Sequence, residues 1–185
     1  MHKSGFINII GNPNVGKSTL MNCFMGEKFS IITSKAQTTR HRILGIVNGE
    51  DFQLVFSDTP GILKPSYELQ DSMMDFVKNA LEDADIIIYM LEIGETSIKN
   101  NQVNKNILNA KVPTFILLNK IDLSDQKSLE DQVILWKELY PKAHIYPISA
   151  LNNFNIDIVL KPVSYTHLRA HETPEHLVCR RLREK

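Results

Sequence analysis

A glycine-rich loop stands between an apolar run of strand length and a segment with helical spacing. The run covers residues 6–10, the loop covers residues 11–18 and reads Gly-Asn-Pro-Asn-Val-Gly-Lys-Ser, and the helical segment covers residues 17–25. The loop matches the pattern G-x-x-x-x-G-K-[ST], which joins a buried parallel strand to the helix that follows it. This one feature indicates an α/β fold built on a mostly parallel sheet.

The rest of the chain, up to about Leu160, alternates apolar runs with segments of helical spacing. We expect strands at residues 6–10, 43–47, 52–56, 86–91, 114–118 and 144–148, and helices at 17–25, 69–81, 98–110 and 129–139, with another beginning near Asn155. Residues 48–51 are too few for a crossover helix, so the strands on either side should pair antiparallel. The predicted fold is a mostly parallel six-stranded sheet with one antiparallel edge strand and helices on both faces.

Size and charge limit the possible classes of protein. The chain has 185 residues, enough for one domain with a sizeable core and too few for two full domains. Basic and acidic residues both number 21, so no net charge draws the chain to nucleic acid or to an anionic membrane. Cys23 and Cys179 are too isolated for a disulfide framework, and no apolar run approaches the ~20 residues that span a bilayer. We expect a cytoplasmic monomer without a leader peptide.

The loop at residues 11–18 has the chemistry of a phosphate cradle. Gly16 lets backbone N–H groups turn toward an anion, Lys17 brings an ammonium to the β- and γ-phosphates, and the Ser18 hydroxyl is a ligand for Mg²⁺. A dinucleotide site would need a G-x-G-x-x-G run, and this loop lacks its second glycine. The expected nucleotide contacts are Gly11, Asn12, Pro13, Asn14, Val15, Gly16, Lys17, Ser18 and Thr19.

A second set of residues follows the strand at 52–56. Asp58 should hold Mg²⁺ through water, and the Gly61 N–H should approach the γ-phosphate, with Thr59, Pro60 and Ile62 beside the nucleotide. Taken alone, Asp-Thr-Pro-Gly is an ordinary turn. Its occurrence in the same chain as the phosphate loop favours a role in binding Mg²⁺ and the γ-phosphate. Residues 27–41 should form a loop that orders around the ligand, with Thr39 preferred to Thr38 as a second hydroxyl ligand of Mg²⁺.

Ile62 occupies the position at which a water-orienting glutamine stands in Ras-type enzymes. Because isoleucine cannot hydrogen-bond to water, hydrolysis should be slow or depend on a backbone group, a cation or a residue lent by a partner. We hypothesise that Asn14 helps bind a K⁺ ion that supplements the charge of Mg²⁺. The alternative is that Asn14 only stabilises the turn. The residues expected to act on the reacting phosphate are Lys17, Thr39, Gly61 and Asn14.

Two further loops have the chemistry of a guanine site. Asp122 is an acceptor for two hydrogen bonds from the guanine N1–H and exocyclic amine, which adenine cannot supply as a pair. Asn119 should tie this loop to the phosphate loop, and the Lys120 stem should lie along the base. After the last strand, Ser149 should brace the base loop while the Ala150 N–H meets guanine O6. The expected base contacts are Asn119, Lys120, Ile121, Asp122, Ser149, Ala150 and Leu151.

With these motifs in this order, the sequence resembles the translation-factor-like GTPases, and in particular the Era family of bacterial ribosome-assembly GTPases. The finer likeness lies in residues 30–43, Ser-Ile-Ile-Thr-Ser-Lys-Ala-Gln-Thr-Thr-Arg-His-Arg-Ile, which look like the first switch of that family. The resemblance implies a Ras-like G domain that binds GTP or GDP with Mg²⁺ and hydrolyses GTP. It also implies a role in 16S rRNA maturation on the 30S subunit, with some peripheral contact with the cytoplasmic membrane.

The resemblance extends from Lys3 to about Leu160 and stops there. We expect a G domain at 1–161 with a shortened last helix, and a non-native tail at 162–185 that looks like a translated vector junction. No glycine follows Gly94, so the Gly-x-x-Gly loop of the family's RNA-binding KH domain should be absent. His167, His171, His176 and Cys179 lack the paired spacing of a zinc site. The alternatives to an active GTPase are a nucleotide-gated binding module with negligible hydrolysis and a non-functional fragment.

Overall fold

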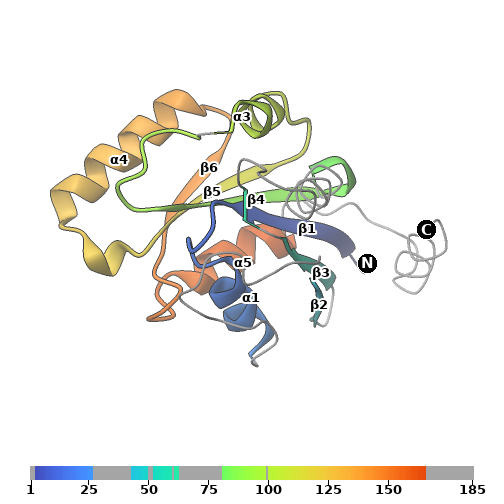
Figure 1. Ribbon diagram of the computed structural model, residues 1–185. Helices are drawn as coiled ribbons and strands as arrows, with labels where there is room; N and C mark the ends of the chain where they lie inside the picture. Colours follow the sequence, from blue (N-terminus) through green and yellow to red (C-terminus); the bar gives the residue numbers. More distant parts are fainter. Residues whose placement is uncertain are drawn as a thin grey trace, which may run out of the picture.

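The computed structural model describes residues 3–26, 43–49, 52–59, 61–62, 81–98 and 100–165. Its strands form one six-stranded sheet in the order β2-β3-β1-β4-β5-β6 (Figure 1). The strands are β1 (Lys3–Gly11), β2 (Ile43–Asn48), β3 (Phe52–Asp58), β4 (Ile86–Glu92), β5 (Thr114–Asn119) and β6 (His144–Pro147). Every neighbouring pair is parallel except β2 and β3, which are antiparallel. The predicted mixed sheet, with its antiparallel edge, is confirmed.

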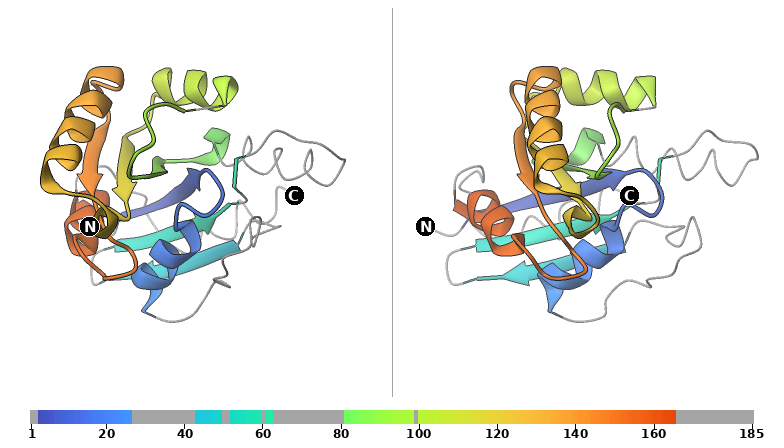
Figure 2. Two further views of the ribbon diagram at one scale, coloured as in Figure 1. Left: turned by 60° about the vertical axis from the view of Figure 1, so that its left-hand side comes forward. Right: turned by 90° about the vertical axis from the view of Figure 1, so that its left-hand side faces the viewer.

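Helices cover both faces of this sheet, as Figures 1 and 2 show. Helices α1 (Lys17–Met25) and α5 (Ile156–Tyr165) pack on one face, and α3 (Asn101–Leu108) and α4 (Gln126–Leu139) pack on the other. A short 3-10 turn, η1 (Ile121–Leu123), follows β5. The central strands β4 and β5 are buried along nearly their whole length, which explains their continuous apolar runs. None of the helices within the described residues is long and apolar enough to cross a bilayer.

Strands β3, β4 and β5 extend further toward their carboxyl ends than their apolar runs predict. β3 ends at Asp58, β4 at Glu92 and β5 at Asn119, so each strand adds a polar residue at the same edge of the sheet. These are the residues that hydrophobic periodicity leaves out, because they lie where ligands of open α/β sheets bind. The elongated strands therefore deliver polar side chains from three neighbouring loops to one edge.

The helix starts are set by capping side chains. α3 begins at Asn101, later than expected, because the Asn100 side chain accepts hydrogen bonds from the N–H groups of Gln102 and Val103. α4 begins earlier than expected, because Asp125 accepts from the Ser128 N–H. The helix predicted at 69–81 lies largely outside the described residues.

The last helix passes the boundary expected at residue 161. α5 runs to Tyr165 with Pro162 inside it, and Val163 is fully buried in the core beneath α1. The Val163 side chain thus belongs to the core of the described fold. The predicted tail beyond Tyr165 lies outside the described residues.

Candidate functional site

The loop between β1 and α1 is shaped by one glycine that no other residue can replace without strain. Gly16 has φ of +100°, and a Cβ placed on it would lie 2.3 Å from Nδ2 of Asn119. Both the left-handed backbone and the close approach require glycine. No side chain caps the N-terminus of α1, and the first N–H groups of a helix are a favourable place for an anion.

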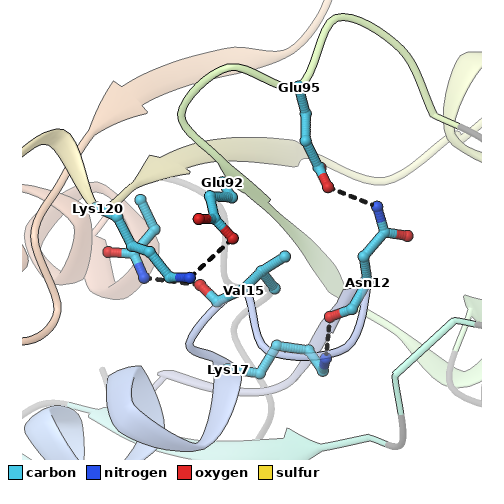
Figure 3. Close-up of polar contacts among 7 residues, drawn as sticks. Asn12, Val15, Lys17, Glu92, Glu95 and Lys120 are labelled. Atoms are coloured by element: carbon cyan, nitrogen blue, oxygen red, sulfur yellow. Dashed lines mark hydrogen bonds and ion pairs between the residues drawn. The ribbon is translucent and has the colours of Figure 1, made fainter. Parts of the chain in front are cut away.

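Lys17 lies buried beneath this loop and is held by its backbone. Its Nζ donates to the Asn12 carbonyl oxygen at 2.7 Å (Figure 3) and to the Gly11 carbonyl oxygen at 3.1 Å. Burial lowers the pKa of Lys17 to about 8, although the carboxylates of Asp58 and Glu95 act in the opposite direction. The ammonium is thus placed at the phosphate loop at some electrostatic cost, which an incoming phosphate would offset.

Ser18 and Asp58 bring two kinds of oxygen together. The Ser18 hydroxyl donates to Oδ2 of Asp58 at 2.6 Å, and Asp58 is fully buried at the end of β3. A hydroxyl and a carboxylate fit the preference of Mg²⁺ for a few protein oxygens completed by phosphates and waters. Within the described ranges no group of three or more His, Cys, Asp or Glu side chains gathers.

Thr59 and Gly61, which follow Asp58, both contact neighbouring parts of the protein. The Thr59 hydroxyl donates to the Ile9 carbonyl at 2.7 Å and is buried, so it fastens the loop to β1. A Cβ on Gly61 would lie 2.8 Å from the backbone of Pro13, which places Gly61 against the phosphate loop. Pro60 and the two candidate metal ligands, Thr38 and Thr39, lie outside the described residues.

The expected place of Ile62 beside the nucleotide stays a prediction, and the structure shows how the residue contacts the protein. That side chain is 5% exposed and packs in the core on the α3 and α4 face, because burial removes its apolar surface from water. Its N–H donates to the Gly11 carbonyl at 2.9 Å. The residue therefore links the end of β3 to the phosphate loop through its backbone and offers no side chain to a water.

Asn119 joins the phosphate loop to the two base loops. Its Nδ2 donates to the Val15 carbonyl at 2.7 Å, and its Oδ1 accepts from the Ala150 N–H at 2.9 Å. The first bond is the tie that the sequence predicts. The second engages the Ala150 N–H, and the expected contact of that group with guanine O6 stays a prediction.

Asp122 is exposed at the mouth of the site and is braced from below. The Ser149 hydroxyl donates to its Oδ1 at 2.5 Å, which fixes the carboxylate while leaving it open to a base. Ser149 itself is 2% exposed. Lys120 has a left-handed backbone, with φ of +65°, and its Nζ pairs with Oε2 of Glu92 at 2.7 Å. Leu151 is 80% exposed beside this loop.

Sequence patterns missed two acidic residues at the same edge of the sheet: Glu92, which ends β4, and Glu95, which lies in the turn after it. Glu92 reaches Lys120 of the base loop, and Oε1 of Glu95 accepts from Nδ2 of Asn12 at 2.9 Å (Figure 3). Their only sequence signal was a carboxylate placed after a buried strand, the signal that singled out Asp58. No motif surrounds them, so periodicity alone did not select them.

Comparison with known proteins agrees with this geometry. A family model described as 50S ribosome-binding GTPase matches residues 6–120. GTPase Era of Staphylococcus haemolyticus is 44% identical over 157 residues, which are 84% of this chain and 52% of that protein. GTPase Era of Clostridium beijerinckii is 40% identical over 162 residues, which are 87% of this chain and 54% of that protein. The chain thus spans about half the length of the curated relatives it matches.

Solved structures give the same likeness. Era in complex with MgGDPNP and nucleotides 1506–1542 of 16S ribosomal RNA superposes with a TM-score of 0.86 at 36% identity, over 94% of this chain and 59% of that one. A point variant of Aquifex aeolicus Era bound to GDP.AlF4⁻ superposes with a TM-score of 0.85 at 36% identity, over 92% of this chain and 58% of that one. The chain has the P-loop G-domain fold.

Proposed function

Because the chain belongs to the family of 50S ribosome-binding GTPases and has an Era-like G domain, we propose that it binds GTP with Mg²⁺ and hydrolyses it to GDP and phosphate. The observation that carries this proposal is the position of Asn119. This side chain bonds both to Val15 in the phosphate loop and to Ala150 in the last base loop. Phosphate-binding and base-reading groups therefore belong to one hydrogen-bonded unit.

The phosphate end of the site uses Lys17 and the N-terminus of α1. The ammonium is aimed by two loop carbonyls, and the uncapped N–H groups of the helix lie beside it. Ser18 and Asp58 are the residues that would hold Mg²⁺, and the ion would neutralise charge on the bridging phosphate oxygens. Era in complex with MgGDPNP supports this assignment for the chain.

Guanine selection is assigned to Asp122. The braced, exposed carboxylate accepts from the two donors on guanine, whereas adenine has no donor at either position and would leave the carboxylate without both hydrogen bonds. The Lys120 stem, held at its end by Glu92, would lie along the base plane.

The decisive experiment for this proposal is nucleotide competition on the purified chain. GDP should displace a fluorescent guanine nucleotide at least about 100-fold more effectively than ADP, on the order of two charge-assisted hydrogen bonds. Asp122→Asn should reverse the preference toward xanthosine diphosphate, whose carbonyl at the position of the guanine amine would accept from the new amide. Equal displacement by GDP and ADP would overturn the assignment.

A second candidate function is a nucleotide-gated binding module with negligible hydrolysis. The burial of Ile62 favours it, because no side chain at that position orients a water. Single-turnover phosphate release separates the two functions. A rate that stays at the level of free GTP in buffer supports the module, and a measurable rate supports a slow GTPase.

The alternative to a K⁺ ion at Asn14 is that this residue only stabilises the turn of the phosphate loop. Asn14 has φ of +62°, a conformation in which asparagine is favoured over most residues, so its place in the turn alone accounts for the residue type. Turnover in KCl and NaCl decides between them. Equal rates support the turn-stabilising role, and a rate that requires K⁺ supports the ion site.

We further propose that the switch serves small-subunit assembly and 16S rRNA maturation. The Era structure that contains nucleotides 1506–1542 of 16S ribosomal RNA supports this role. The net charge of zero suits a domain that signals rather than grips nucleic acid. Filter binding of the rRNA 3′ end should show far weaker retention by this chain than by a full-length Era, and equal retention would contradict the view that this domain signals without gripping the RNA.

A further inference from the structure

The turn that follows β4 is fixed from both sides. The Glu95 N–H donates to the Glu92 carbonyl at 3.1 Å, across Gly94, which has φ of +96°. Helix α4 holds the turn from outside: the Gly94 N–H donates to Oε1 of Gln132 at 3.0 Å, and the indole N–H of Trp136 donates to the Glu95 carbonyl at 3.1 Å. The two glutamate side chains are thus presented to the site from a rigid base.

Each glutamate reaches a different loop of the site. Glu95 accepts from the Asn12 side chain in the phosphate loop, and Glu92 pairs with Lys120 in the base loop (Figure 3). The Lys120–Glu92 pair is 31% and 39% exposed, so solvent weakens it. Glu95 is deeper, and its Oε2 is a buried atom with no hydrogen-bond partner among the described residues.

A chain of two hydrogen bonds connects Glu95 through Asn12 to the buried ammonium of Lys17. Asn12 donates through its side chain to Glu95 and accepts through its carbonyl from Lys17 at 2.7 Å. The Glu95 carboxylate also acts on Lys17 through space, since it is one of the two charges that oppose the fall in the pKa of Lys17. A carboxylate whose second oxygen is buried and unsatisfied carries a desolvation cost, so its orientation toward Asn12 is strongly specified.

We propose that Glu95 is a positioning residue for the nucleotide phosphates, acting through Asn12 on the loop that carries Lys17, while Glu92 acts in the same way on the base through Lys120. This inference rests on the proposed function. It makes the turn at residues 92–95 a further part of the nucleotide site, outside the motifs that define it in sequence.

The two glutamates predict different losses for different ligands. Glu95→Ala should lower the affinity for GDP about tenfold, which is the size of one charge-assisted hydrogen bond. The affinity for guanosine should stay unchanged, because guanosine has no phosphates. Glu92→Ala should lower the affinities for GDP and for guanosine by the same factor, roughly two- to threefold, because the Lys120–Glu92 ion pair is partly exposed. Both ligands are measured by competition against a fluorescent guanine nucleotide on the full chain.

Three further variants separate positioning from a merely structural role. Glu95→Gln keeps an acceptor for Asn12 and should restore most of the GDP affinity. Asn12→Ala should match Glu95→Ala, and the double variant should be no weaker than either single one, because both remove the same bond. Glu138→Ala removes an exposed glutamate from α4 and should leave the affinity for GDP unchanged.

The fluorescence emission of Trp136, the only tryptophan of the chain, gives a separate readout. Its maximum should shift on GDP binding in the wild type, and should shift less in Glu95→Ala.

The outcomes are distinguishable. If the wild-type chain fails to bind GDP, the proposed function falls and this inference falls with it. If the wild type binds GDP and Glu95→Ala binds it equally well, or loses GDP and guanosine in the same proportion, only the inference is overturned. Additive losses in the double variant, with unchanged melting temperatures, also overturn it.

Discussion

At the scale of single residues, the charge on Lys17 couples nucleotide binding to pH. Burial lowers its pKa from an ordinary 10.5 to about 8, and a bound phosphate would raise that pKa again by pairing with the ammonium. Above pH 8 binding therefore takes up a proton, so GDP affinity should fall as pH rises, by up to about tenfold per pH unit. Phosphate ionises near about pH 6, below this window.

Calorimetry of GDP binding between about pH 7 and 9.5, in buffers of different ionisation enthalpy, measures both the affinity and the proton uptake. Over the window from about 8 to 10.5 the free chain should become more stable, because the unfolded chain then binds more protons than the folded one. Affinity that stays flat across this range would contradict the buried position of the ammonium.

Gly16 allows a second test at this scale. Gly16→Ala would force a Cβ to within 2.3 Å of Nδ2 of Asn119 in a left-handed backbone, so it should cost more than about 2 kcal/mol and abolish GDP binding. Gly26 is the matched control, because it has φ of +69° and, among the described residues, no atom within 4 Å of the point where its Cβ would lie. Gly26→Ala should cost about 1 kcal/mol and leave binding intact. Chemical denaturation and GDP titration measure the two effects, and equal losses of binding would disprove the proposed contact.

At the scale of elements, α3 depends on its cap. Asn100 accepts from two N–H groups of the first turn, so Asn100→Ala should lower the free energy of unfolding by about 1 kcal/mol. Asn106→Ala removes only a surface bond from Gln102 on the same helix and should cost about 0.5 kcal/mol or less. Urea denaturation of the two variants measures the difference. A larger loss for Asn106→Ala would show that the helix start is fixed by other contacts.

The strands, the helix starts and the site residues differ in how well the sequence predicted them. Periodicity found every strand of the described sheet, because each has an apolar run, and in the central strands that run is buried between two helical layers. It misplaced the start of α3, which depends on the local bonds of Asn100. The motifs identified Lys17, Asp58 and Asn119, since each chemistry requires that residue type after a strand. Glu95 could not be found in this way, because it meets Asn12 across 83 positions and only the order of strands brings them together.

At the scale of the whole molecule, the nucleotide site fastens the two helical layers to each other. The core beneath α1 and α5 and the core beneath α3 and α4 lie on opposite faces of the sheet. Side-chain bonds at the sheet edge connect them: Asn119 joins the loop before α1 to the loop before α5, and Glu95 joins the loop before α1 to α4. A ligand bound at this edge therefore contacts loops from both layers, and its binding energy should stabilise the chain as a unit.

Ligand-linked melting tests this last point and separates a working site from a non-functional fragment. GDP at about 100 times its dissociation constant should add about 2.7 kcal/mol to the free energy of unfolding, which for a domain of this size is a rise of roughly 5–10 °C in melting temperature. ADP should give no rise, and Lys17→Ala, which removes the buried ammonium, should abolish the effect of GDP. A wild-type melting temperature that ignores GDP at every concentration would mean that the loops, although assembled at one edge, do not form a site.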